Sequence, residues 1–233
     1  MLVNEDNLIY IKTLETDSID FIYFDPPFAI TEASYDTSLK WSELWPEMWR
    51  VLKPKGVIAI HTSQPFTFDL ISTQRKHFKY CWYWKKNHKT GHLFSKHQPM
   101  RCIEEVCIFY KKNKYNPQMI KLEKPIEYNG RNVSTGNYYH RDKGMPPKTY
   151  THNYPTHLLQ YNSIKHPYST RPIELCEYFI KTYSNENDVI LDLTCSNATA
   201  GVACINLNRK YIGVDIDEKM INDAKERLKK IDT

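Results

Sequence analysis

The chain has 233 residues, 41% hydrophobic and 25% charged, with a net charge of +5, which is the composition of a globular protein with one substantial core. No apolar stretch is long enough to cross a bilayer, and the acidic, polar N-terminus does not resemble a signal peptide, so we expect a cytoplasmic protein without a membrane partner. The six cysteines form no CxxC pair and the nine histidines lack ligand spacing, so we expect reduced thiols and no metal.

Short apolar segments rich in β-branched and aromatic residues predict strands, in chain order Ile19–Phe24, Val57–His61, Phe78–Trp84, Glu105–Tyr110, Val189–Leu193 and Tyr211–Val214. Helical patterns alternate with them: near Trp41–Val51, from around Pro65, from Pro172 to about Tyr183, over Thr199–Leu207, and from an N-cap at Asp217. This alternation predicts an α/β fold with a mostly parallel, doubly wound sheet. Residues 113–168 lack periodicity and predict a loop-rich insert.

Positive charge is concentrated in the middle of the chain. Residues 75–148 contain 17 Lys or Arg and 5 Asp or Glu, a balance of +12, so the rest of the chain carries −7. Aromatic residues are interleaved with this charge, and such a mixture can hold phosphates and stacked bases. Nucleic-acid binding is one interpretation. A solvated basic face over core aromatics is the other.

The first predicted strand ends in Asp25-Pro26-Pro27-Phe28, which places a carboxylate at the edge of the sheet where open α/β folds bind ligands. Each proline fixes its own φ angle and restrains the preceding residue, so the carboxylate and the Pro26 carbonyl have little freedom. Neither proline donates a backbone hydrogen bond. Acceptors beside an aromatic ring suit a planar group with an NH2, such as adenine. A proline turn beside an incidental aspartate is the alternative.

The DPPF string resembles the catalytic motif of the amino-group DNA methyltransferases, which act on N6 of adenine or N4 of cytosine. The segments TSQPFTFDLI, CWYWKKN and EEVCIFYKKNKYNPQ look like phage and prophage members of that family. An aspartate precedes the family's motif at a spacing that matches Asp6. The catalytic half comes first, as in the permuted β subgroup. The resemblance implies a Rossmann-like, S-adenosylmethionine-dependent methyltransferase fold.

The closing block, from HPYSTRP to GVDIDE, resembles the family segment that carries the S-adenosyl-L-methionine site. Independently, two of its predicted strands end in Asp192 and Asp215, and an acid at the end of the second strand is well placed to hold a ribose diol, although a strand-end cap is the alternative. The resemblance implies that Asp192 helps to position the methionine portion. It extends the cofactor-binding set to Asp6, Asp25, Ser169, Thr170, Pro172, Thr194, Ser196, Asn197 and Thr199.

The sequence departs from the family in three places. A Gly-Ser-Gly loop usually follows the first acid, whereas Ser196, Asn197 and Ala198 stand here. Left-handed geometry at Ser or Ala would cost roughly 1–2 kcal/mol. The HPTQKP block is HPYSTRP here, with one extra residue, and Phe28 replaces the usual tyrosine while keeping the ring for stacking.

These residues predict a site-specific adenine-N6 DNA methyltransferase, with a role in restriction–modification implied by the resemblance. Asp25 and the Pro26 carbonyl would accept the two amine hydrogens of a base extruded from the duplex, and Phe28 would stack on it. The runner-up acceptor is N4 of cytosine. Because the loop glycines are lost, a catalytically silent DNA-binding relative is a further alternative.

The expected organisation is a single methyltransferase domain over residues 1–233. Residues 1–112 would form the catalytic half, 113–165 a target-recognition insert, and 166–233 the cofactor-binding half. The substrate would be double-stranded DNA, and a homodimer or a partner subunit is left open. The candidates for phosphate contacts are Lys85, Lys86, Lys89, Arg101, Arg131 and Arg141.

Overall fold

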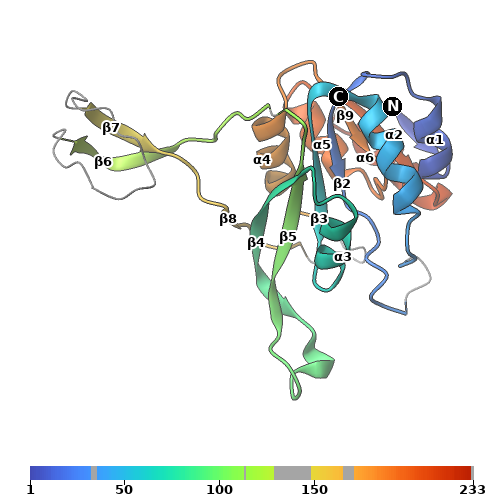
Figure 1. The fold of residues 1–233 in the computed structure, drawn as a ribbon, viewed down its shortest axis with the longest axis horizontal. Helices are drawn as coiled ribbons and strands as arrows, with labels where there is room; N and C mark the ends of the chain where they lie inside the picture. The colour runs from blue at the N-terminus through green and yellow to red at the C-terminus, as the bar shows by residue number, and fades with distance from the viewer. Residues whose placement is uncertain (33–35, 113, 129–147, 165–170, 232–233) are drawn as a thin grey trace. The chain divides into compact units, whose positions relative to one another are not determined.

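The computed structural model describes residues 1–32, 36–112, 114–128, 148–164 and 171–231. They form two compact units, one of Met1–Asn116 with His157–Thr233 and one of Pro117–Thr156. The strands of the larger unit are β1 (Leu2–Asn4), β2 (Ile19–Phe24), β3 (Leu52–Thr62), β4 (Phe78–Thr90), β5 (Arg101–Phe109), β8 (Leu158–Gln160), β9 (Val189–Asp192) and β10 (Lys210–Asp215). They make one eight-stranded sheet in the order β1-β10-β9-β2-β3-β5-β4-β8 (Figure 1).

The predicted mostly parallel α/β sheet is confirmed. Strands β1, β10, β9, β2 and β3 run parallel to one another, whereas β5 is antiparallel to both of its neighbours, β3 and β4. The predicted strand Ile19–Phe24 has the bounds of β2, and all six of its residues are buried. Burial on both faces explains its continuous apolar pattern, which is typical of parallel sheets.

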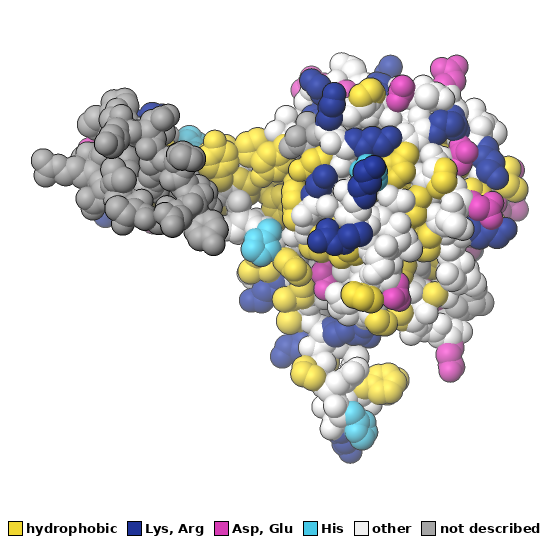
Figure 2. All heavy atoms as spheres, viewed as in Figure 1, with side chains coloured by type: hydrophobic (Ala, Val, Ile, Leu, Met, Phe, Trp, Pro, Cys, Tyr) yellow, Lys and Arg dark blue, Asp and Glu magenta, His cyan; other side chains and the backbone are white. Residues whose placement is uncertain are grey.

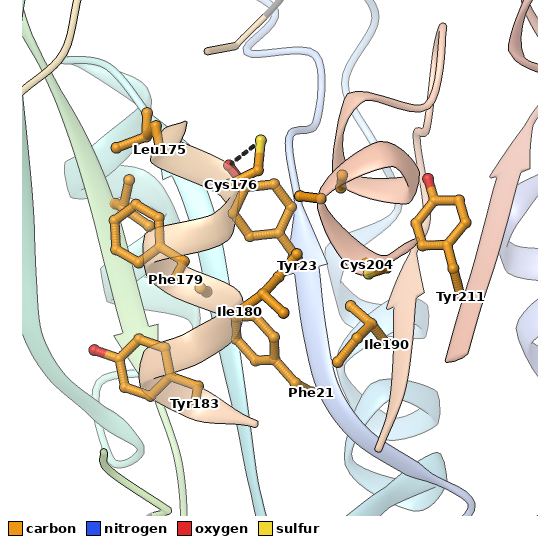
Figure 3. Close-up of a cluster of buried hydrophobic side chains, with 14 of the residues drawn as sticks. Phe21, Tyr23, Leu175, Cys176, Phe179, Ile180, Tyr183, Ile190, Cys204 and Tyr211 are labelled. Carbon is orange, nitrogen blue, oxygen red and sulfur yellow. Dashed lines mark hydrogen bonds between the residues drawn. The ribbon is translucent and has the colours of Figure 1, made fainter. Parts of the chain in front are cut away.

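Helices cover both faces of the sheet, as the alternating pattern predicted. Their bounds are α1 (Asn7–Thr13), α2 (Trp41–Val51), α3 (Phe66–Thr73), α4 (Ile173–Tyr183), α5 (Thr199–Asn206) and α6 (Glu218–Lys229). One core lies between the sheet and α4, α5 and α6, and a second between the sheet and α1, α2 and α3. In the first core, Phe21 and Tyr23 of β2 pack against Phe179 and Tyr183 of α4 (Figure 3).

The segment without periodicity contains strands that the sequence pattern did not predict. Strands β6 (Ile120–Tyr128) and β7 (Lys148–Asn153) pair antiparallel in the smaller unit, and β8 joins the edge of the main sheet beside β4. All six residues of β7 are exposed, so no buried face imposes an alternating pattern on them. No helix of the described residues is long and apolar enough to span a membrane.

The strand order reverses between β9 and β2. From β9 the chain passes through α5 to β10, whereas from β2 it passes through α2 to β3 on the opposite side. The carboxyl ends of such a pair are the usual ligand site of an open α/β sheet. The motif DPPF follows β2 directly, so the fold places it at this reversal.

Candidate active site

Three carboxylates lie at the carboxyl edge of neighbouring strands: Asp25 after β2, Asp192 at the end of β9, and Asp215 at the end of β10. Burial raises the pKa of all three. The effect is largest for Asp192, whose pKa rises to about 7 through burial and through repulsion from Asp25 and Asp215. The strand ends therefore form a partly desolvated, acidic site.

The loop after β2 is held by prolines and by one acid. Pro26 is buried, and the Phe28 ring stacks on Phe66 of α3 with their centroids 5.4 Å apart. Ala29 follows in the left-handed region at φ 53°. The Asp36 carboxylate accepts backbone hydrogen bonds from Ala29, Ile30 and Thr31 at 2.7 to 3.0 Å. This one side chain therefore fixes the turn that follows the DPPF motif.

Asp25 has one carboxylate oxygen in an ion pair. Its Oδ1 accepts a hydrogen bond from Arg171 Nη2 at 2.8 Å, and the side chain keeps 25% of its surface exposed. The second oxygen, Oδ2, accepts no hydrogen bond from the residues that the structure describes. The backbone carbonyl of Asp25 accepts from Thr194 Oγ1 at 2.8 Å, which ties the loop after β2 to the loop after β9.

The loop after β9 adopts the backbone geometry that glycine favours, without glycine. Ser196 has φ 45° and Ala198 has φ 54°, both in the left-handed region. These are the first and third positions of the lost Gly-Ser-Gly string, so the expected strain of roughly 1–2 kcal/mol applies at each. The Ser196 N–H donates to Asp215 Oδ2 at 2.7 Å, and the Asp217 N–H donates to Asp215 Oδ1 at 3.0 Å.

Side chains from two other elements support this loop. Arg227 of α6 donates from Nη1 to the Asn197 carbonyl at 3.2 Å and to Thr199 Oγ1 at 3.0 Å. The Tyr211 hydroxyl of β10 donates to Asp192 Oδ2 at 3.0 Å. A Cβ at Gly201 would come within 2.7 Å of the Tyr211 ring, so any larger residue would force this ring to move.

Comparison with known proteins identifies the fold and the family. The family model described as DNA methylase, of the N6 and N4 type, matches residues 19–226. The type II methyltransferase M.HpaI of Haemophilus parainfluenzae is 28% identical over 94% of this chain and 70% of its own length. The DNA adenine methyltransferase YhdJ of Escherichia coli is 26% identical over 97% of this chain and 82% of its own. The crystal structure of an M1.HpyAVI–SAM complex superposes with a TM-score of 0.65 at 23% identity, covering 98% of this chain and 99% of that one.

The chain belongs to the DNA methylase family. It is a DNA methyltransferase that uses S-adenosyl-L-methionine. The resemblance carried by the DPPF motif and by the closing block is thereby confirmed at the level of the family, and so is the predicted methyltransferase fold.

The acidic edge fits the charge of this cofactor. S-adenosylmethionine carries a sulfonium and an ammonium cation, and a neighbouring cation stabilises the ionised form of a carboxylic acid. The carboxyl groups of Asp25, Asp192 and Asp215 all have raised pKa values in this structure, so a cation placed beside any of them would favour its ionised form. The residues that the structure describes contain no group of three or more His, Cys, Asp or Glu side chains placed to hold a metal ion.

Several predicted cofactor residues in this methyltransferase have structural partners. Asp6 follows β1 and caps α1, accepting from the Leu8 and Ile9 N–H groups at 2.9 and 3.1 Å. Pro172 occupies the N-cap position of α4, and Asn197 Oδ1 accepts from Thr199 Oγ1 at 3.0 Å. The other two predicted residues, Ser169 and Thr170, lie outside the described residues.

The predicted DNA-binding residues lie mainly on a hairpin formed by β4 and β5. Thr62, the last residue of β3, pairs with Glu105 of β5. The part of the hairpin from Lys85 to Ile103 therefore has no partner in β3, and it projects past the edge of the sheet that carries the acids (Figure 1). Lys85, Lys89 and Arg101 are exposed on it. Residues 85–103 contain no Asp or Glu, and lysine, arginine and histidine side chains line the projecting part (Figure 2). At the tip, Leu93 is 90% exposed.

Lys86 requires a correction. It was grouped with the phosphate ligands, but its side chain is only 8% exposed and donates to Glu104 Oε1 at 2.6 Å. Residues alternate between the two sides of a strand, so Lys86 faces the core whereas Lys85 faces solvent. We therefore leave Lys86 out of the DNA-binding surface. Arg131 and Arg141 lie outside the described residues.

Sequence reasoning missed two residues beside Asp25. Arg171 contacts both Asp25 and Glu104, although it is separated from them by 146 and 67 positions in the chain. Arg171 could have been noticed in the sequence, because it is the basic residue of the variant HPYSTRP block. Glu104 had none, because its partners come from other strands and loops.

Proposed function

We propose that this DNA methyltransferase methylates the N6 amino group of adenine. The proposal rests on the DPPF motif at the end of β2: Asp25 is partly exposed, its Oδ2 accepts no hydrogen bond from the described residues, and the two prolines restrain Asp25 and the Pro26 carbonyl. The name of the relative YhdJ, a DNA adenine methyltransferase, also supports adenine. N4 of cytosine carries an NH2 of the same kind and is the alternative acceptor.

The exocyclic amine is a weak nucleophile because its lone pair is delocalised into the ring. Asp25 and the Pro26 carbonyl would each accept one amine hydrogen, which favours a more tetrahedral nitrogen and orients its lone pair. Because both acceptors are fixed before the base arrives, the site gains from orientation and from preorganised polarity. The base has to leave the duplex to reach this strand end, and Phe28 would stack on it there.

The cofactor would bind at the ends of β9 and β10, next to the base site at Asp25. We propose that Asp215 contacts its ribose and Asp192 its methionine portion, with further contacts from the loop of Thr194, Ser196, Asn197 and Thr199 and from Asp6, Ser169, Thr170 and Pro172. When bound, S-adenosylmethionine supplies an electrophilic methyl group. The hydrogen bond between Thr194 and the Asp25 carbonyl would keep the cofactor loop in register with the base site.

Lys85, Lys89 and Arg101 would contact DNA phosphates from the projecting hairpin, and Arg131 and Arg141 from the insert. Under this proposal, residues 1–112 supply catalysis, 113–165 target recognition and 166–233 cofactor binding within one domain. The permuted order, a phage origin, a homodimer or partner subunit, and a cytoplasmic location stay predictions.

Nucleoside analysis tests the proposal directly. The chain is incubated with methyl-labelled cofactor and mixed-sequence double-stranded DNA, and the DNA is then digested and separated. We expect the label in N6-methyladenine. Label confined to N4-methylcytosine would overturn the choice of base while retaining the family. DNA without label, together with no cofactor binding by calorimetry, would indicate a silent DNA-binding relative.

A further inference from the structure

Four charged side chains of alternating sign form a continuous row that begins at Asp25. Arg171 Nη2 lies 2.8 Å from Asp25 Oδ1 and 3.1 Å from Glu104 Oε2, and Lys86 Nζ lies 2.6 Å from Glu104 Oε1. The last three side chains are only 8 to 13% exposed. Buried charges are costly unless they are paired, so a row of four needs a reason.

The row lies at the end of the hydrophobic core that contains Trp82, Trp84 and Val106. Lys86 follows Trp82 and Trp84 on one face of β4, and Glu104 precedes Val106 on the same face of β5. Trp84 forms the floor, with the Arg171 guanidinium 5.7 Å and the Lys86 ammonium 5.9 Å from the ring centroid. Packing against a rigid indole restricts where both cations can be.

The row engages only one of the two Asp25 oxygens. Arg171 is drawn towards two carboxylates at once, and Lys86 balances the second of them. We infer that Arg171, held in place by Glu104 and Lys86, is a positioning residue that keeps Asp25 ionised and turns its free oxygen towards the target amine. This inference rests on the proposed function, because it assigns a support to the proposed amine acceptor.

The charges around Asp25 act on it in opposite directions. Burial raises the pKa of Asp25, Arg171 lowers it and Glu104 raises it. Other ionisable groups also lie nearby. Burial raises the pKa of Asp192 on β9, Tyr23 on β2 and Cys176 on α4. Burial and the Arg171 cation lower the pKa of His61 on β3, which bonds to the Tyr23 hydroxyl. Removal of Arg171 and removal of Glu104 should therefore shift the ionisation of Asp25 in opposite senses.

The test is the pH dependence of kcat/KM for DNA at saturating cofactor, which reports ionisation in the enzyme that awaits its substrate. We expect Arg171→Gln to move the acidic limb to higher pH and Glu104→Gln to move it to lower pH, each by about one pH unit. Arg171→Lys retains the charge but not the planar fork, so it should restore the limb while kcat stays below that of the unaltered chain.

Two controls separate positioning from general stability. Lys181→Gln removes a cation from the exposed side of α4, where it pairs with Glu177 at 3.5 Å, and should leave the profile unchanged. If Arg171→Gln fails to fold, Glu104→Gln and Arg171→Lys still test the inference through the direction of the shift. The inference would be overturned if the acidic limb of the pH profile stayed in place in the Arg171 and Glu104 variants, or moved in the same direction in both. The proposed role of Asp25 fails separately, if Asp25→Ala remains active.

Discussion

Two loops leave the neighbouring strands β2 and β9 at the same edge of the sheet, and they reach their geometry by different means. The loop after β2 is restrained by Pro26 and Pro27 and closed by the Asp36 carboxylate. The loop after β9 has no proline, and Ser196 and Ala198 have left-handed geometry. Other elements hold this loop, since the Ser196 N–H donates to Asp215 and Arg227 donates to the Asn197 carbonyl.

The first loop is restrained mainly by its own residues, whereas the second loop is restrained by contacts with other elements. Proline limits φ in the unfolded chain as well, so the ordering of the first loop loses less conformational entropy. The second loop is strained and depends on partners such as Asp215 and Arg227. We therefore expect the first loop to tolerate changes around it, and the second to respond to changes at its partners.

The largest expected effect distinguishes Asp25, in the loop after β2, from Asp215, the last residue of β10, which holds the loop after β9. Asp25→Ala should lower kcat by about 10³-fold, because it removes a preorganised acceptor for the amine. Cofactor affinity, measured by calorimetry, should fall far less than kcat, because Asp192 and Asp215 remain in place at the proposed cofactor site. Asp215→Ala should instead weaken cofactor binding and loosen the backbone at Ser196, to which it is bonded. Full activity of Asp25→Ala would remove Asp25 from the proposed mechanism.

The second prediction concerns the pH dependence of stability at Asp192. Its pKa rises from the usual value near 4 to about 7 in the folded chain. The folded state therefore holds an extra proton between these values, and the free energy of unfolding falls as the pH rises through this window, by at most about 1.4 kcal/mol per pH unit. Urea unfolding between pH 4.5 and 7 measures this slope.

Asp192→Asn should flatten the slope, because the amide does not titrate. Asp223→Asn, on the exposed side of α6, is the matched control and should leave the slope unchanged. Saturating cofactor should also flatten it, since a cation near Asp192 favours the ionised form. An unchanged slope in Asp192→Asn would mean that other groups carry the pH dependence.

The sequence predicted the elements that are buried on both faces and the acids that end them. β2 has the predicted bounds, and Asp25, Asp192 and Asp215 lie on neighbouring strands as expected. Left-handed geometry in the loop after β9 also follows from the family pattern, since the positions of Ser196 and Ala198 usually hold glycine. Local sequence patterns were sufficient to predict the structure where it depends on the residues of a single segment.

The parts that were missed depend on partners far away in the chain. The inward orientation of Lys86 is decided by Glu104 and by the register of β4 with β5, which a basic run in the sequence does not reveal. The Arg171–Asp25 ion pair joins residues 146 positions apart. The three-residue strand β1 and the exposed strand β7 are too short, or too polar, to give a pattern.

The smallest expected effect compares the two loops most directly, because each contains one alanine in nearly the same backbone geometry. Ala29 has φ 53° and is exposed, whereas Ala198 has φ 54° and is fully buried. Glycine relieves about 1–2 kcal/mol of strain at either position but loses about 0.4–1 kcal/mol through the entropy of the unfolded chain. Ala29→Gly should therefore raise the free energy of unfolding by about 0.5–1 kcal/mol.

Ala198→Gly gains the same relief but also gives up a buried methyl group worth about 0.8 kcal/mol, so its net change should lie near zero. Ala203→Gly, in the interior of α5 and equally buried, has no strain to relieve and should cost about 1 kcal/mol or more. Urea unfolding of the three variants gives the order Ala29→Gly, Ala198→Gly, Ala203→Gly from most to least stable. If Ala198→Gly were as destabilising as Ala203→Gly, the loop after β9 would carry no strain, and the contrast between the two loops would rest on the prolines alone.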